Sequence, residues 1–167
     1  MNKGTLGIPS PDRDTFTSRL LHIRDERASG TAGGTATSGS WLTRTIQTVK
    51  TNEIPGSSLL SNVISLPPGK YWGEITSAFH SNMTGNQSRL YNTSLGAMVL
   101  LSNNGYATTS GFVSSTASGR FTLSSYALLE LQYRVALTRS TDGLGNALSW
   151  GTEVYADVRI WQIRGMR

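Results

Sequence analysis

Few residues of this chain have the types and spacing that catalysis requires. Nucleophilic catalysis needs a nucleophile held by a base, which is most often histidine. The chain has two histidines, His22 and His80, and no cysteine. Ser81 follows His80 directly, but serine is so abundant in this sequence that the proximity carries little weight. We therefore interpret His80 as a solvated loop histidine and predict that the chain is not an enzyme.

Two carboxylates near the C-terminus form the other candidate for catalysis. Glu153 and Asp157 would share one face of a strand, and a pair of carboxylates can hydrolyse a glycosidic bond. The alternative is that both are surface acids, which pair with Arg134 or Arg159 on adjacent strands. We favour this second interpretation, so polysaccharide depolymerisation stays the less favoured function.

The signals for a metal or another ligand are weak. Residues 142–146 supply oxygen ligands and glycines, as calcium loops do, but the spacing is not that of an EF-hand and the nearest closing acid is Glu153. We interpret this segment as a glycine-rich turn and expect no metal and no cofactor. Trp150, beside Gly151 in a predicted loop, is the best candidate for an exposed platform on which a sugar could stack.

Composition places the chain among globular proteins of one domain. Of its 167 residues, 37% are hydrophobic and 15% are charged, which is too apolar for a disordered chain. The net charge is +5, but the arginines are scattered without a dense basic block, so nucleic-acid binding is disfavoured. The sequence begins without a signal-peptide pattern and has no run that suits a membrane span. The sequons at Asn82, Asn86 and Asn92 are therefore interpreted as chance matches.

Most of the chain has the pattern of β-strands separated by turns. Residues 70–80 alternate between two faces, and residues 127–137 place apolar side chains on one face and polar ones on the other. The run 153–163 alternates in the same way. About eight to ten short strands predict an antiparallel sandwich, barrel or jelly roll. Residues 19–27 fit either a strand or a short helix, and residues 29–40 read as a flexible, low-complexity loop.

The N-terminal segment differs from the rest. Residues 1–18 are polar, contain Pro9 and Pro11, and have too little apolar surface to order themselves. We expect this segment to be an extended arm that anchors the chain, and residues 19–167 to form the β domain.

Several segments together resemble a widespread bacteriophage family of virion and tail-fibre proteins. They are His-Ile-Arg-Asp-Glu at 22–26, the run from Ser40 to Val49, Asn-Glu-Ile at 52–54, the run from Ile64 to Trp72, Arg-Leu-Tyr-Asn at 89–92, and the run from Thr152 to Trp161. The resemblance spans residues 22–163 and leaves the arm uncovered. It implies an all-β, antiparallel jelly-roll sandwich similar to the trimeric domains of the tumour-necrosis-factor and complement-head superfamily. In such a domain, the segment around Ile23 is the first strand and the C-terminal run is the last strand, at the trimer axis.

The resemblance leads to one expected function and to alternatives. The expected function is a structural bacteriophage protein of the virion, a homotrimeric knob whose arm attaches it to the capsid or tail as a decoration or short fibre. Assembly would take place in the host cytoplasm. A receptor-binding protein that serves host attachment by gripping surface glycans through distal loops is the alternative, and a free lectin-like module is a further one. The candidates for the trimer interface are Tyr71, Tyr133, Tyr155 and Trp161.

Overall fold

The structure is a computed structural model, which describes residues 18–107 and 113–163. The predicted arm lies outside these residues except for Ser18. Residues 19–27 form a strand and not a helix. The described strands are β1 (Arg19–Arg27), β2 (Leu42–Thr43), β3 (Thr48–Asn52), β4 (Ser58–Leu60), β5 (Val63–Leu66), β6 (Gly69–Phe79), β7 (Asn86–Asn92), β8 (Ala97–Leu101), β9 (Val113–Leu123), β10 (Ala127–Val135) and β11 (Glu153–Ile163).

The strands build two sheets. Sheet 1 has the order β3-β1-β11-β6-β9, and sheet 2 has the order β4-β5-β10-β7-β8 with β2 beside β10. Neighbouring strands pair antiparallel throughout both sheets. The predicted all-β jelly-roll sandwich is confirmed. Within the described residues, no helix is long and apolar enough to cross a membrane.

The core lies between the two sheets and follows the alternation of the strands. On β6, alternate residues from Tyr71 to Phe79, which include Ile75, point inward and are buried, and the residues that alternate with them, such as Trp72 and Glu74, point outward. The inward side chains of both sheets form a main cluster of buried aliphatic residues, to which Ile23 and Leu129 belong. A smaller cluster lies nearer one end of the sandwich and consists of Ala36, Phe79, Met83, Tyr133, Val135 and Leu144.

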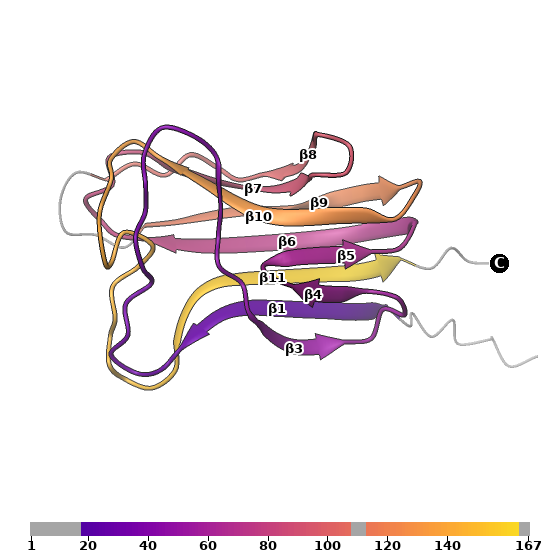
Figure 1. Cartoon of the computed structure of the whole chain (residues 1–167), viewed down its shortest axis with the longest axis horizontal. Helices are drawn as coiled ribbons and strands as arrows, with labels where there is room; N and C mark the ends of the chain where they lie inside the picture. The colour runs from indigo at the N-terminus through magenta and orange to yellow at the C-terminus, as the bar shows by residue number, and fades with distance from the viewer. Residues whose placement is uncertain (1–17, 108–112, 164–167) are drawn as a thin grey trace, which may run out of the picture.

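The two ends of the sandwich are different. Arg19 pairs with Gln162, so the start of β1 and the end of β11 lie side by side, and both are at one end of the molecule in Figure 1. The long connections between strands gather at the other end, which we call the distal end (Figure 1). A chain that is held near its termini would therefore present the distal end outward.

The segment 29–40 is tied into this distal end, contrary to its predicted flexibility. The amide of Gly33 donates to the carbonyl of Gly145 at 2.9 Å, and Ala36 and Arg139 form an antiparallel bridge. A Cβ atom at Gly33 would lie 2.6 Å from the backbone of Leu144, so only glycine permits this close approach. Backbone pairing, which low-complexity composition does not reveal, orders the segment.

Candidate functional site

The outer face of sheet 1 brings together side chains from strands that are far apart in the sequence. Register places Leu20 beside Trp161, and Trp161 beside Trp72, in one row across β1, β11 and β6. The next row holds His22, Arg159 and Glu74, and the row after it holds Arg24, Asp157 and Thr76. One apolar row thus borders two charged rows on the same face.

The apolar row is half-buried within the single chain. Leu20, Trp72 and Trp161 all keep part of their surface accessible. The indole Nε1 of Trp72 donates to Glu74 Oε1 at 3.1 Å, so its polar atom is already satisfied at the boundary with the charged rows. Two indoles side by side on an open sheet face form a surface that a protein neighbour could cover favourably.

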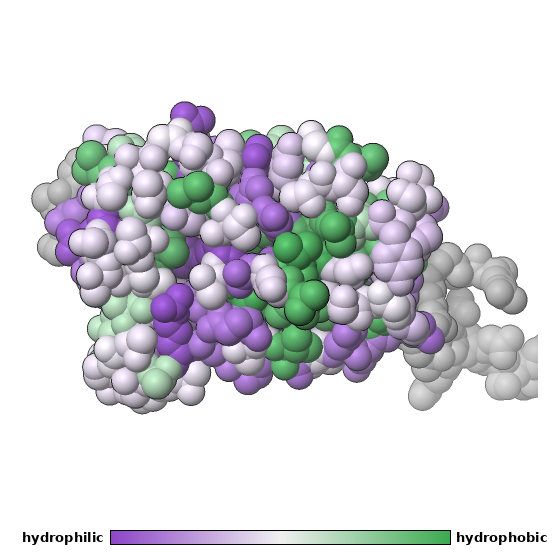
Figure 2. All heavy atoms as spheres, in the orientation of Figure 1, coloured by the Kyte–Doolittle hydropathy of each residue, from purple (hydrophilic) through white to green (hydrophobic). Residues whose placement is uncertain are grey.

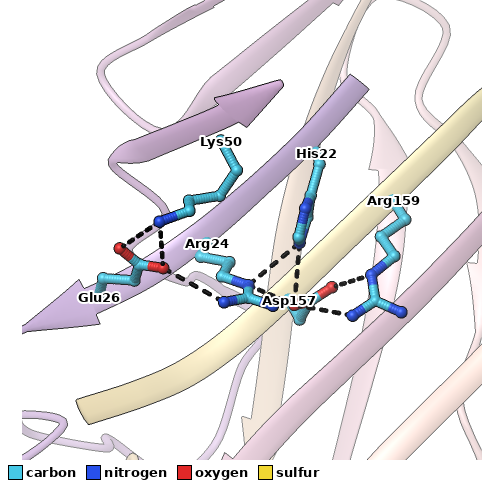
Figure 3. A network of polar contacts seen from close by, with 6 residues as sticks. All are labelled: His22, Arg24, Glu26, Lys50, Asp157 and Arg159. Atoms are coloured by element: carbon cyan, nitrogen blue, oxygen red, sulfur yellow. Dashed lines mark hydrogen bonds and ion pairs between the residues drawn. The ribbon is translucent and has the colours of Figure 1, made fainter. Parts of the chain in front are cut away.

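Asp157 is the centre of the charged rows. Its Oδ2 lies 2.6 Å from Arg24 Nε and 3.0 Å from His22 Nε2, and its Oδ1 lies 2.9 Å from Arg159 Nε. Glu26 bridges Arg24 at 3.3 Å and Lys50 at 3.2 Å (Figure 3). We call these six residues, His22, Arg24, Glu26, Lys50, Asp157 and Arg159, the Asp157 cluster.

The charges of the Asp157 cluster nearly cancel when the neighbouring Glu74 is included. Burial would raise the pKa of Asp157, but the hydrogen bonds from His22 and Arg24 outweigh it, and the pKa lies below its ordinary value. A hollow of about 260 Å³ in front of Asp157 and Arg159 is also lined by Glu74. With Glu74 the Asp157 cluster carries equal numbers of carboxylates and permanent cations, which lowers the electrostatic cost of covering it. Elsewhere on the face, the exposed Lys70 of β6 and Arg120 of β9 add positive charge.

The structure separates the four predicted interface residues into two groups. Trp161 lies on the outer face of sheet 1. Tyr71, Tyr133 and Tyr155 are buried inside the single chain, so they have almost no surface to offer a neighbouring subunit. Their hydroxyls form hydrogen bonds with the backbone of loops. Tyr71 donates to the carbonyl of Pro67, and Tyr155 donates to the carbonyl of Thr31. Tyr133 accepts from the amide of Thr37. Strand alternation alone did not reveal which face turned inward.

The two carboxylates proposed for glycoside hydrolysis are not brought together. A bulge in the pairing of β1 with β11 falls between them. Glu153 is buried, and its carboxylate accepts from the backbone amides of Leu148 at 3.1 Å, Gly30 at 3.1 Å and Ser149 at 2.7 Å, which hold its pKa below the ordinary value. Asp157 belongs to the cluster on sheet 1. Each carboxylate is engaged by its own partners. The pairing of Asp157 with Arg159 agrees with the alternative interpretation, although Arg159 lies on the same strand, and among the described ion pairs Arg134 contacts neither carboxylate.

His80 is buried, which corrects its interpretation as a solvated loop histidine. Its side chain is held between Asn82, whose amide donates to Nδ1 at 3.1 Å, and Asp142, whose Oδ2 lies 3.7 Å from Nε2. Asp142 also accepts from Arg139 Nε at 2.6 Å, so this carboxylate of the 142–146 segment closes a turn. Within the described residues, no group of three histidine or acidic side chains could hold a metal ion.

The predicted platform, Trp150, lies at the distal end and is 88% exposed. Its position agrees with the expected exposure, and binding to it stays a prediction.

Arg44 is a residue that the sequence analysis missed. It is fully buried, its Nη2 donates to the carbonyls of Leu144 and Tyr155 at 2.8 Å each, and its guanidinium carbon lies 5.1 Å from the centre of the Phe79 ring. Burial lowers its pKa to about 10, although the charge of Asp25 opposes that shift. Its position inside a β-rich stretch of alternating residues is the only signal for burial that the sequence contains.

Apolar surface is not confined to sheet 1. Figure 2 shows hydrophobic residues gathered over β4 and β5, and Leu60 of β4 is exposed. The hairpin of β7 and β8 exposes Leu95, Met98 and Leu101 at the opposite edge of sheet 2. The chain therefore has more than one surface that a neighbour could cover.

Comparisons with known proteins identify the class of fold. No family model matches the chain, and no curated protein matches it. Among solved structures, murine APRIL at pH 5.0 is 10% identical, with a TM-score of 0.58 over 88% of this chain and 100% of that one. The globular domain of zebrafish complement 1qA protein is 11% identical, with a TM-score of 0.55 over 89% of this chain and 99% of that one.

The chain therefore has a jelly-roll fold of the tumour-necrosis-factor and complement 1q type. At these identities the likeness concerns the fold alone. It agrees with the fold that the sequence resemblance implied, and it says nothing of a bacteriophage origin.

Proposed function

We propose that this chain is a structural protein that assembles as a homotrimeric knob, with the outer face of sheet 1 in the subunit interface. The observation that carries the proposal is the composition of that face. An apolar row with two indoles borders a charge-balanced cluster, and interfaces combine an aromatic centre with a polar rim in the same way.

Two different apolar surfaces favour a closed ring over a two-fold dimer. A two-fold interface buries the same patch of both subunits, whereas a ring joins one patch to a different patch on the next subunit. The face of sheet 1 with Trp161 and the β7–β8 edge with Met98 and Leu101 are two such patches. The sequence resemblance to trimeric jelly rolls supplies the number of subunits.

The wider role that we propose is that of a bacteriophage virion component. The resemblance of residues 22–163 to virion and tail-fibre proteins supports this role. In the proposal, the arm (residues 1–18) attaches the knob to the capsid or tail. β1 begins at the end of the sandwich opposite the distal end (Figure 1), so an attachment through the arm leaves the distal end facing outward.

The interface is tested by one substitution with a matched control. Trp161→Arg places a charge in the apolar row, and we expect it to convert the trimer to a monomer in light scattering coupled to gel filtration. Trp150→Arg changes the same residue type at an 88% exposed distal position, and we expect it to leave the trimer intact. A Trp161→Arg variant that stays trimeric would contradict the proposed interface. Circular dichroism of both variants checks that the fold is kept.

A further inference from the structure

A pocket lies where β6 and β11 separate at the distal end of sheet 1. The pairing of these two strands ends at Ser77 and Ala156, and the residues beyond that pair line a hollow of about 410 Å³ together with the loop that precedes β11. This volume is within the range that small molecules and large side chains fill. We call it the Val154 pocket, and the lining residues used below are Ala78, Ser81, Asn146, Leu148, Thr152 and Val154.

The Val154 pocket combines apolar surface with neutral polar groups. Ala78 alternates with the inward Phe79 and so belongs to the outer face of sheet 1, while Val154 is 42% and Leu148 is 57% exposed. These apolar side chains are uncovered in the single chain, next to the neutral polar residues of the lining. A tyrosine, with an apolar ring and a hydroxyl, matches such a lining better than a charged side chain does.

The wall of the pocket is fixed in place by Glu153. Its carboxylate accepts from the amides of Leu148 at 3.1 Å and Ser149 at 2.7 Å, which ties the preceding loop to the start of β11. The carboxylate is therefore already satisfied and does not call for a cation in the pocket. A pocket whose wall is held by backbone hydrogen bonds is formed before anything enters it.

Tyr106 is the exposed tyrosine of the distal end. Its side chain is 76% exposed, but the backbone on both sides of it is held. Gly105 exchanges two hydrogen bonds of 2.9 Å with Asn86, and the carbonyl of Ala107 accepts from the amide of Thr84 at 3.1 Å. An exposed ring on a fixed backbone loses little conformational entropy when a neighbour covers it, as a good interface anchor requires.

Tyr106 and the Val154 pocket lie on different sides of the chain but at the same end. Tyr106 follows β8, whose edge is the second apolar patch of the proposed ring, and it is not among the residues that line the Val154 pocket. It lies beside Asn86, the first residue of β7, and the start of β7 and the end of β6 are both at the distal end (Figure 1). Rotation about a ring axis keeps each residue at its own height, so joined patches must lie at similar heights. With the axis along the sandwich, Tyr106 and the pocket meet this condition.

We propose that Tyr106 of the next subunit fills the Val154 pocket, so that each pocket of the trimer is completed by a neighbour. Its ring covers Val154 and Leu148, and its hydroxyl bonds to a polar side chain of the lining. The inference rests on the proposed trimer and deepens it by naming a contact between subunits. Trp150 is not among the residues that line the pocket, so its substitution keeps its place as a control.

The test places a photoreactive aromatic residue at the expected contact. The full chain is prepared with p-benzoylphenylalanine in place of Tyr106, irradiated, separated on a denaturing gel and digested for mass spectrometry. We expect covalent dimers and trimers in which the residue at position 106 is linked to a peptide within residues 145–154. The same photoreactive residue in place of Tyr126, which is 55% exposed, is the matched control, and we expect no link to residues 145–154.

Light scattering of the same samples separates this inference from the function on which it rests. A trimeric mass together with links to other parts of the neighbour, or with no links between chains, would overturn the contact and leave the trimer standing. A monomeric mass would overturn the trimer and the contact with it.

A pair of substitutions tests whether the two sides act on one contact. Tyr106→Ala removes the ring, and Val154→Phe fills the pocket from its own chain; both positions are exposed, and circular dichroism checks that the fold is kept. We expect each variant to raise the concentration at which half of the trimer dissociates by about tenfold or more. The double variant should be no weaker than the single ones, because both remove the same contact. Losses that add in the double variant, or an equal loss in Tyr126→Ala, would contradict the inference.

Discussion

The Asp157 cluster on sheet 1 and the surroundings of Asn86 at the distal end both contain polar side chains, but the two regions differ in how completely these groups are hydrogen-bonded. In the cluster, Asp157 and Glu26 each contact two or more basic side chains. At the distal end, the buried amide of Asn86 has no partner among the described residues. A buried group that is satisfied within the chain stabilises the fold, whereas one that is left without a partner lowers the stability.

Unpartnered groups concentrate toward the distal end. Of the buried side-chain atoms without a partner in the described part of the chain, Arg44 contributes Nε and Nη1, Asn86 contributes both amide atoms, and Ser77 of β6 contributes its hydroxyl. Arg44 contacts Phe79 in the smaller core cluster. The region beneath the loops is therefore packed less completely around its polar groups than the main core, which is almost wholly aliphatic.

The largest effect that would sharpen this comparison is expected at Asp157. Asp157→Asn removes the charge that holds Arg24 and Arg159 together and leaves those cations facing one another. We expect it to lower the free energy of unfolding by about 1–3 kcal/mol, measured by urea denaturation.

Glu74→Gln is the matched control for this substitution on the same face. Glu74 accepts a hydrogen bond from the Trp72 indole, which a glutamine oxygen can also accept. We expect a change of about 0–1 kcal/mol. Equal losses for the two variants would mean that the Asp157 cluster contributes no more than an ordinary surface group.

A smaller effect on the free energy of unfolding is expected when the pH is lowered. The pKa of Asp157 in the folded chain lies below the ordinary value of 3.8, and a carboxylate with a lowered folded pKa stabilises the protein fully above its unfolded pKa. That contribution is lost as the pH falls through the folded pKa, so we expect the free energy of unfolding to decrease below about pH 4. Asp142 and Glu153, whose pKa values are also lowered, add to the same decrease.

The contribution of Asp157 to this acid effect is separated with the same variant. Urea denaturation of the unmodified chain and of Asp157→Asn is compared across this pH range, and we expect a shallower decrease in the variant. Identical slopes would show that Asp157 does not titrate at a lowered pKa in the folded protein.

The sequence predicted the strands better than it predicted the side-chain environments. Alternation in residues 153–163 and 127–137 was sufficient for the strands, because burial of one sheet face imposes a period of two. It could not say that Tyr71 and Tyr133 point inward, since alternation defines two faces without orienting them. The face to which Tyr155 points depends in addition on a bulge in the pairing of β1 with β11. This bulge involves residues more than a hundred positions apart in the sequence.

The surroundings of the polar residues were the least predictable. His80 reads as a loop residue, but Asp142 from another loop covers it. Arg44 and Asn86 are buried because loops distant in the sequence close over them, and composition gives no sign of this. The Asp157 cluster likewise needs three strands in register, of which β1 and β11 are the first and last.

The mass of the unmodified chain in solution tests the central claim of a homotrimer most directly. Light scattering at several micromolar concentrations should give three times the chain mass of 18.0 kDa, without a change on dilution across that range. A mass of 18.0 kDa at every one of these concentrations would contradict the account.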